Sequence, residues 1–319
     1  MKALVYTGNA TVRYLDVDAS MPGIDEVSIR VLQAGICGTD MCVVRDERPK
    51  VAPPMILGHE FIGQRLDTGE RVIVNPILSC KMCRACTEGR MHLCEHRLVL
   101  GVHRAGAFAE TISVPTSNLV SAGTASLAQA AMVDPIATAL HAFRLAPFPQ
   151  GPVAVLGAGA IGLSTLFVLK HFGVVDVTVT DIADVRLELA ARGGANRVGK
   201  SADGIYDVVY DTAGTVATRR DAMLKTRAGG TAVLIGLHSA ELSMPAGPLI
   251  GGERTLRGSF GYTDAEFVEA AALVTALDTS WVHTIKFEDA EESFNALLRG
   301  RSDPSHVKIQ MQMPGLARH

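Results

Sequence analysis

The chain has 319 residues, which at roughly 150 residues per domain corresponds to about two domains. Hydrophobic residues make up 48% and charged residues 20%, so the chain can bury sizeable cores and is not a disordered segment. The 30 Lys and Arg against 33 Asp and Glu give a net charge of −3, which argues against a nucleic-acid binder. The longest apolar stretch, 154–169, is 16 residues long with three glycines, too short to span a membrane. Without a signal-peptide core at its N-terminus, the protein is expected to be cytoplasmic.

The first 120 residues are predicted to be rich in β-strands. Residues 25–35 (DEVSIRVLQAG) alternate apolar and polar positions, and 69–76 (GERVIVNP) repeat the pattern before a proline. Glycines and prolines separate such runs at short intervals, as an all-β barrel-like domain requires. From about residue 127 the spacing becomes helical, and Pro135 is expected to open a second helix at its first position.

A strand, glycine turn and helix pattern begins after residue 150. Alternating strands and helices indicate a parallel sheet with right-handed crossovers. Strands are expected at 153–157, 176–181, 206–214, 231–237 and 255–261, and helices at 161–173 and 184–194. The last part is predicted to hold helices at 264–277 and 289–300 and a final strand at 306–312.

GAGAIG fits the pattern G-x-G-x-x-G between an apolar strand and an apolar helix, the context that makes it a strong dinucleotide signal. Gly157 is expected to make the tight turn, and Gly159 to let the backbone approach the pyrophosphate. Gly162 allows close packing of helix on strand. The helix N-terminus, at Ala160 and Ile161, then presents free N–H groups and the positive end of its dipole to the phosphates.

Asp181 ends the next expected strand, 19 residues after Gly162. A carboxylate there accepts hydrogen bonds from a ribose 2′-hydroxyl and repels a 2′-phosphate, and no arginine follows immediately. The sequence therefore favours NAD over NADP. The alternative is a helix-capping aspartate in a sheet that binds no cofactor.

Cys80, Cys83, Cys86 and Cys94 have the spacing C-x2-C-x2-C-x7-C. Four thiolates on one short loop can surround a zinc ion tetrahedrally. An iron–sulfur cluster would favour a last gap of three followed by proline, but here the gap is seven and Glu95 follows. A disulfide is the other alternative, and the absence of a secretory signal argues against it. The pattern predicts a structural zinc site.

In combination, these motifs resemble the zinc-dependent medium-chain alcohol and polyol (sorbitol-type) dehydrogenases over essentially the whole chain. The segments that carry the resemblance occur in the family's order, namely GICGTD (35–40), LGHE (57–60), the four-cysteine loop, GAFAE (106–110) and GAGAIG (157–162). The resemblance implies an α/β protein, with a β-rich GroES-like catalytic domain and a Rossmann domain whose doubly wound parallel sheet binds the nicotinamide cofactor. It implies a catalytic domain of residues 1–135 and 259–319 around a Rossmann domain of residues 136–258.

The resemblance also implies a catalytic zinc in addition to the structural one. Cys37 and His59 match two of its ligands, and the third would be Asp134 or Glu60, with water or substrate completing the shell. Asp134 occupies the position of the second cysteine of alcohol dehydrogenase, as the carboxylate of polyol members does. Thr39 matches the residue whose hydroxyl takes the proton of the alcohol.

Several cofactor contacts follow from the same resemblance. In the family the proton relay continues through the coenzyme ribose to a histidine, but Cys42 stands at that position here. Ile235, Gly236 and Leu237 match the segment whose backbone meets the nicotinamide amide. Lys308, in the last strand, is expected to reach the cofactor phosphates.

The implied activity is a zinc- and NAD-dependent dehydrogenase that acts on a secondary alcohol, a polyol or a sugar-acid hydroxyl. The expected partner is a small-molecule alcohol or polyol substrate, and neither a nucleic acid nor a membrane is expected to bind. The family also suggests a homodimer or homotetramer that forms through the strand at 255–261. A primary-alcohol or aldehyde dehydrogenase and a non-catalytic nucleotide-binding relative are the alternatives. The chain is short for the family, and 199–205 (GKSADGI) is too short for a full crossover helix. The sequence does not name the substrate.

Overall fold

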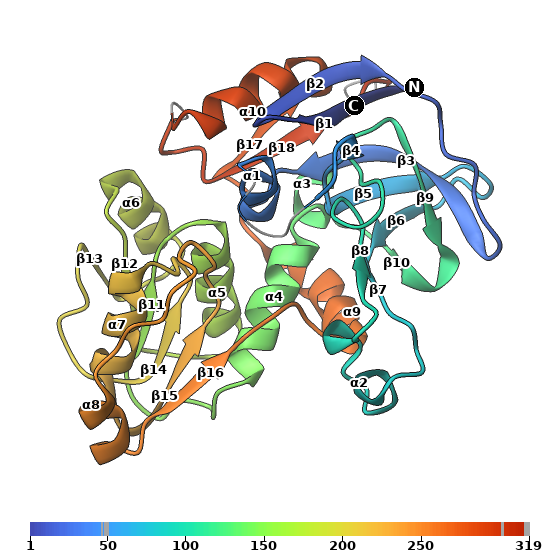
Figure 1. Ribbon diagram of the computed structural model, residues 1–319. Coiled ribbons are helices and arrows are strands. Elements are labelled where there is room, and N and C mark those ends of the chain that lie inside the picture. Colours follow the sequence, from blue (N-terminus) through green and yellow to red (C-terminus); the bar gives the residue numbers. More distant parts are fainter. Residues whose placement is uncertain (46, 48–50, 301–302, 316–319) are drawn as a thin grey trace. The chain divides into compact units, whose positions relative to one another are not determined.

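The computed structural model describes residues 1–45, 47, 51–300 and 303–315, and its chain divides into two units. The first unit combines Met1–Asp134 with Thr263–His319, and the second is Pro135–Tyr262. The second unit is therefore an insertion in the sequence of the first, visible in the colour order of Figure 1. The chain returns to the first unit at Thr263, whereas the sequence suggested residue 259.

Among the described residues, the main sheet of the first unit has seven strands in the order β10-β6-β5-β3-β18-β17, with β9 also paired to β3. The strands are β3 (Glu26–Gly35), β5 (Glu60–Arg65), β6 (Arg71–Val74), β9 (Thr111–Pro115), β10 (Leu119–Ser121), β17 (Val282–Lys286) and β18 (Lys308–Gln312). Gly35, at the end of β3, pairs with Glu60 on one side and with Gln310 on the other. The C-terminal strand β18 therefore lies beside the GICGTD segment.

The first unit also holds two smaller sheets and short helices. A three-stranded sheet of order β2-β1-β4 and the pair β7-β8 are formed by β1 (Lys2–Gly8), β2 (Thr11–Asp16), β4 (Met55–Ile56), β7 (Ile77–Leu78) and β8 (Leu98–Val99). The α-helices are α1 (Gly38–Val44), α2 (Arg84–Thr87), α3 (Leu127–Ala130), α9 (Asp264–Leu273) and α10 (Ala290–Leu298), with 3₁₀ turns at Met91–Leu93, Thr116–Asn118, Val274–Ala276 and Phe287–Asp289. Helix α10 lies along β2 (Figure 1), and the buried rings of Phe108 and Phe294 meet edge to face at 6.5 Å between centroids.

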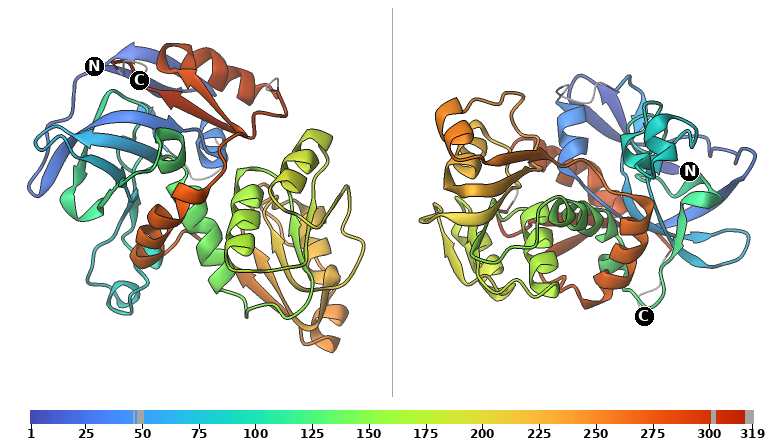
Figure 2. Two further views of the ribbon diagram at one scale, coloured as in Figure 1. Left: turned by 180° about the vertical axis from the view of Figure 1, so that it is seen from behind. Right: turned by 90° about the horizontal axis from the view of Figure 1, so that it is seen from below.

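The second unit is built on a wholly parallel sheet of order β13-β12-β11-β14-β15-β16. Its strands are β11 (Val153–Leu156), β12 (Val177–Thr180), β13 (Arg197–Gly199), β14 (Tyr206–Asp211), β15 (Thr226–Leu234) and β16 (Thr255–Gly258), and its helices are α5 (Ala160–His171), α6 (Asp184–Arg192), α7 (Val216–Lys225) and α8 (Ala246–Gly251). Every residue of β11 and β12 is buried, because helices cover both faces of a parallel sheet. Figures 1 and 2 show α5 and α7 on opposite sides of it. This is the doubly wound arrangement that the sequence predicted.

From β11 the chain adds β12 and β13 on one side, and it then returns to add β14, β15 and β16 on the other side of β11. Ligands of open parallel sheets bind at such a switch point, beyond the carboxyl ends of the strands. The glycine-rich segment that follows β11 therefore occupies the position where a dinucleotide binds in this kind of fold.

Helix α4 (Val133–Arg144) begins earlier than expected. Pro135 is its third residue and not its first, which the helix tolerates because N–H groups of the first turn have no acceptor within the helix. No helix lies between β13 and β14, as the short 199–205 segment predicted. In the described part of the chain, no helix combines the length and the apolar character that a membrane crossing requires.

Candidate metal centres and dinucleotide site

Two groups of potential metal ligands occur among the described residues, and one of them is formed by Cys37, His59 and Glu60. Cys37 caps the N-terminus of α1, directly after β3, and Glu60 is the first residue of β5. Since β3 and β5 are antiparallel and Gly35 pairs with Glu60, the sheet brings the two segments together. The ligand atoms of the three side chains lie within 4.8 Å of one another, and a thiolate, an imidazole and a carboxylate are donors that suit zinc.

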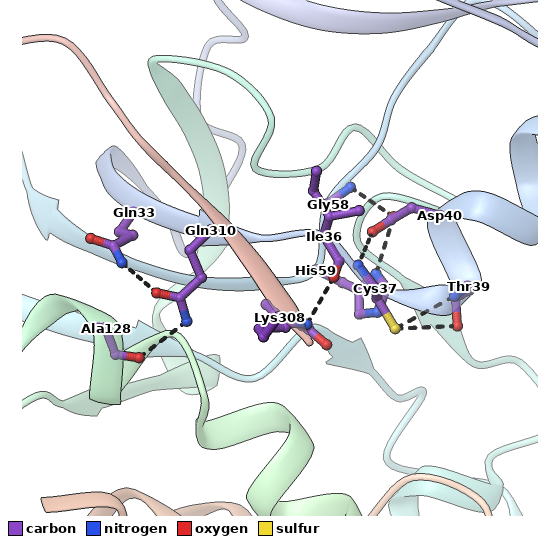
Figure 3. A network of polar contacts seen from close by, with 11 residues as sticks. Gln33, Ile36, Cys37, Thr39, Asp40, Gly58, His59, Ala128, Lys308 and Gln310 are labelled. Carbon is purple, nitrogen blue, oxygen red and sulfur yellow. Dashed lines mark hydrogen bonds and ion pairs between the residues drawn. The ribbon is translucent and has the colours of Figure 1, made fainter. Parts of the chain in front are cut away.

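Asp40 fixes the backbone on both sides of this group (Figure 3). Its Oδ2 accepts a 2.8 Å hydrogen bond from Cys37 N, and its Oδ1 accepts a 3.3 Å bond from Gly58 N. The same Oδ1 lies 3.6 Å from Nδ1 of His59. Because Asp40 is buried, its carboxylate can hold the orientation of both ligand-bearing segments, as carboxylates behind metal-bound histidines do.

His59 is buried, and its Nδ1 has no hydrogen-bond partner among the residues that the structure describes. Burial alone would lower its pKa, but the negative charges of Asp40 and Cys37 outweigh burial and raise the pKa well above its ordinary value. The surroundings of His59 thus favour positive charge at this point. A buried imidazole beside a thiol and two carboxylates fits a divalent cation.

Lys308 lies in the last strand, as the sequence predicted, and has partners that the sequence did not indicate. The side chain is buried in the first unit, where Nζ forms an ion pair with Oε2 of Glu60 and donates a 2.9 Å hydrogen bond to Ile36 O. Burial opposes its charge, but Glu60 and Cys37 outweigh burial and raise the pKa of Lys308. The ammonium is thus held by two partners within the first unit. The expected contact of Lys308 with the cofactor phosphates stays a prediction.

The structure also distinguishes between the two carboxylates considered as the third ligand. Glu60 belongs to the group with Cys37 and His59, whereas Asp134, in the first turn of α4, does not. Thr39 adjoins the group, with its N–H 3.5 Å and its Oγ1 3.7 Å from Sγ of Cys37.

The second ligand group consists of the four clustered cysteines, Cys80, Cys83, Cys86 and Cys94, whose sulfur atoms lie within 4.8 Å of one another. Backbone N–H groups point at these sulfurs, including Cys80 N at 3.3 Å from Cys94 Sγ and Cys83 N at 3.4 Å from Cys80 Sγ. The N–H groups of Cys86 and Glu95 lower the pKa of Cys83 to about 6. N–H donors stabilise thiolates, so this loop is prepared to hold a zinc ion.

The glycine-rich turn has the geometry that a bound pyrophosphate requires. Gly157 has φ +105°, a conformation that favours glycine, and a Cβ at Gly162 would overlap the carbonyl oxygen of Gly157. A Cβ at Gly159 would meet no atom, so the space above the turn is open. Gly159 is the N-cap of α5 and no side chain caps that end, so the first N–H groups of the helix, from Ala160 and Ile161 onward, are free to donate to an anion.

Asp181 lies beside this turn at the end of β12. Its Oδ2 accepts a 2.8 Å bond from Ala158 N and its Oδ1 a 2.9 Å bond from Ala183 N. Nη1 of Arg186 lies 3.8 Å from Oδ2, a neighbour that the sequence analysis did not consider. The carboxylate is thus held rigidly next to the turn.

The segment expected to meet the nicotinamide follows β15. The N–H groups of Ile235 and Gly236 donate to the carbonyl oxygen of Asp211, and Leu237 is 73% exposed. The buried Arg219 donates to the carbonyl oxygens of Gly236 and Glu241, at 3.0 and 2.6 Å. This segment is therefore fixed at its base, while Leu237 is accessible.

The sequence did not indicate that Asp40 lies beside His59 or that Lys308 pairs with Glu60. The spacing from Cys37 to Asp40 was a usable signal, because an N-cap residue and an acidic residue three positions later form a capping box, which the structure contains. Lys308 gave no such local signal.

Comparison with known proteins is consistent with this geometry. The family model described as the alcohol dehydrogenase GroES-like domain matches residues 23–124, and the zinc-binding dehydrogenase model matches residues 160–276. Similar curated proteins include an L-threonine 3-dehydrogenase of Streptomyces coelicolor (32% identical, covering 94% of this chain and 97% of that protein) and an L-galactonate-5-dehydrogenase of Escherichia coli K12 (31%, covering 86% and 88%).

Similar solved structures include a complex with NADH and a complex with NADP. One is a short chain alcohol dehydrogenase from Escherichia coli CFT073 complexed with NADH (TM-score 0.89, 26% identity, covering 98% of this chain and 99% of that one). Another is a zinc-binding dehydrogenase from Sinorhizobium meliloti 1021 bound to NADP (TM-score 0.89, 26% identity, covering 98% of each chain). The fold is thus shared with proteins that bind either nicotinamide cofactor.

Proposed function

Because the chain belongs to the zinc-dependent medium-chain alcohol and polyol dehydrogenase family, we propose that it transfers hydride between NAD and a secondary alcohol. The observation that carries this proposal is the convergence of Cys37, His59 and Glu60 within 4.8 Å. A protein that only bound nucleotides would have no use for a thiol, an imidazole and a carboxylate in this arrangement. The group therefore counts against the non-catalytic alternative.

Cys37, His59 and Glu60 would hold the catalytic zinc, and the four clustered cysteines a structural one, so we propose two zinc ions per chain. A zinc ion at the first site would supply a Lewis acid that lowers the pKa of an alcohol. Asp40 keeps Cys37 and His59 in place through its two carboxylate oxygens. The burial of His59 and Glu60 excludes water and strengthens the electrostatic interactions in the site.

We propose that Oγ1 of Thr39 relays the proton that the alcohol loses. Its position 3.7 Å from Sγ of Cys37 supports this role. Cys42, in the same helix, is a poor next acceptor, because burial and a hydrogen bond with Glu47 raise its pKa to about 11 and keep the thiol protonated. The proton must therefore leave through water or another group.

A nicotinamide dinucleotide would supply the hydride acceptor, held by its pyrophosphate at Gly157, Gly159 and the free N–H groups at the start of α5. We propose NAD as the natural cofactor. The carboxylate of Asp181 is fixed beside this turn, where it can accept hydrogen bonds from a 2′-hydroxyl and would repel a 2′-phosphate. Ile235, Gly236 and Leu237 are the proposed backbone contacts of the nicotinamide amide.

A small polyhydroxylated or amino-bearing molecule with a secondary hydroxyl is the proposed substrate class. The curated relatives named above, an L-threonine 3-dehydrogenase and an L-galactonate-5-dehydrogenase, support this class. We also propose a homo-oligomer formed through β16, the exposed outer strand of the six-stranded sheet. Convergence of four cysteines as metal ligands supports a reducing, cytoplasmic location.

The test is NAD reduction by the zinc-loaded protein over a panel of polyols, sugar acids, L-threonine and simple primary and secondary alcohols. We expect turnover with a secondary alcohol of the first three groups and weaker turnover with primary alcohols. Faster turnover of primary alcohols would favour the primary-alcohol alternative. A zinc-loaded protein that turns over none of these compounds would exclude the proposed activity.

A further inference from the structure

Lys308 connects the last strand of the chain to both segments that carry the proposed ligands. It is the first residue of β18, it is only 3% exposed, and its Nζ contacts Oε2 of Glu60. The same Nζ donates to Ile36 O at 2.9 Å, the residue before Cys37 (Figure 3). One ammonium thus holds a ligand carboxylate and the backbone beside a ligand thiol.

Gly35 leaves the space in which this ion pair forms. Gly35 pairs with Glu60 of β5 and lies beside β18, so it is flanked by both partners. A Cβ at this position would lie 2.5 Å from Oε2 of Glu60 and 2.8 Å from Cε of Lys308. Any larger residue at position 35 would therefore push the carboxylate and the ammonium apart.

The buried negative charges around the ligand group require a cationic partner such as Lys308. Glu60 and Asp40 are buried carboxylates beside the Cys37 thiol, and a buried carboxylate without a partner is unfavourable by several kcal/mol. Asp40 accepts hydrogen bonds from the N–H groups of Cys37 and Gly58, whereas Oε2 of Glu60 is paired with the ammonium of Lys308. With Oε2 paired to Lys308, the other oxygen of Glu60 would be available to a metal ion.

We propose that Lys308 is a positioning residue of the metal centre, which fixes the carboxylate of Glu60 and thereby sets how tightly and in what geometry Cys37, His59 and Glu60 hold their ion. The C-terminal strand then completes the metal centre. This inference rests on the proposed metal site, but it does not depend on the reaction or the substrate.

Gln310 provides a matched control in the same strand. It is fully buried and two residues from Lys308, and its side chain bonds to Gln33 and to Ala128 O, at 3.1 Å for the latter. In the described part of the chain, no side-chain hydrogen bond or ion pair joins Gln310 to Cys37, His59 or Glu60. Gln310→Met therefore removes buried polar contacts from β18 without touching the ligand group.

The experiment uses the full-length protein with cobalt in both proposed sites, and follows the visible spectrum and the loss of each ion to a chelator. The four-cysteine site serves as an internal control for folding. We expect Lys308→Met to change the spectrum of the cobalt held by Cys37, His59 and Glu60 and to weaken its binding by about 10- to 100-fold. Lys308→Arg should restore most of the binding, and Gln310→Met should leave the spectrum of this site unchanged.

The proposal would be overturned if Lys308→Met showed the wild-type cobalt spectrum and held cobalt at this site as tightly as the wild-type protein. It would also be overturned if Lys308→Met and Gln310→Met lost cobalt from this site equally, because Lys308 would then have only a structural role. If Lys308→Met does not fold, Gly35→Ala carries the test, because it separates the same pair, and unchanged cobalt binding in that variant would be equally decisive. A wild-type protein that binds cobalt at this site but reduces no NAD would contradict the proposed function and leave this inference standing.

Discussion

Thr39 is placed at the N-terminal end of α1, where its Oγ1 lies 3.7 Å from Sγ of Cys37. Thr39→Val keeps the shape of the side chain and removes the hydroxyl, so we expect kcat to fall by about 10²- to 10⁴-fold while both metal ions stay bound. Steady-state kinetics with metal analysis checks this, and Thr39→Ser should retain much of the activity. Near-normal turnover of Thr39→Val would remove Thr39 from the mechanism.

Asp181 should decide between the two nicotinamide cofactors. Replacing it by Ser removes the negative charge beside the turn, so the ratio of kcat/KM for NAD to that for NADP should fall by about tenfold or more, equivalent to roughly 1.4 kcal/mol. Arg186, now without its acidic neighbour at 3.8 Å, would be available to a 2′-phosphate. An unchanged ratio would show that cofactor choice lies elsewhere.

At the residue scale, the sequence identified those site residues whose signal is local. Cys37, His59 and the cysteine cluster stand in short motifs of characteristic spacing. The contacts of Lys308 with Glu60 and Ile36 could not be predicted, because they depend on the pairing of β18 with β3, and the acceptor Ile36 is 272 positions away in the chain. Likewise, the register of β3 on β5 brings Glu60 beside the segment that carries Cys37, which spacing in the sequence does not reveal.

The turn between β11 and α5 gives a prediction at the scale of elements. A Cβ at Gly162 would overlap Gly157 O, so Gly162→Ala should lower the free energy of unfolding by about 1–3 kcal/mol and abolish tight NAD binding. Gly159→Ala meets open space in the protein and should leave the melting temperature unchanged while weakening NAD binding. Thermal unfolding and NAD titration of both variants separate packing from cofactor contact. Wild-type NAD affinity in both would contradict the assigned site.

The four-cysteine loop should hold its own metal independently of the other site. Cys94→Ser removes a buried sulfur that accepts N–H bonds from Cys80 and His96, so the zinc content should fall from two ions to one, with a lower melting temperature. Cys42→Ser is the control, because Cys42 lies outside both ligand groups, and it should retain two ions. Two zinc ions in Cys94→Ser would show that this loop is not a zinc site.

Elements with a strong local pattern could be predicted closely. The buried strand β11 is an apolar run, β12 consists of β-branched residues, and the alternation at 25–35 corresponds to β3. The start of α4 at Val133, before Pro135, was missed because a proline signals only that it lies in the first turn, and not at which position.

At the scale of the whole molecule, the sequence predicted the fold class and an inserted parallel-sheet unit, and the structure and family matches confirm the fold class. The chain returns to the first unit at Thr263 and not at residue 259, because the residues between β16 and Thr263 carry no break in composition that would mark the boundary. The ligand group belongs to the first unit and the dinucleotide turn to the second.

The central claim is that hydride passes from a secondary carbinol carbon to NAD under the control of the Cys37 metal site. The most direct measurement incubates the zinc-loaded protein with NAD and a secondary alcohol deuterated at that carbon, and detects deuterium in the reduced nicotinamide by mass spectrometry. We predict deuterium transfer by the wild-type protein and none above background by Cys37→Ser, which keeps the four-cysteine site intact. Undiminished transfer by Cys37→Ser, or reduction of NAD without deuterium, would contradict the account.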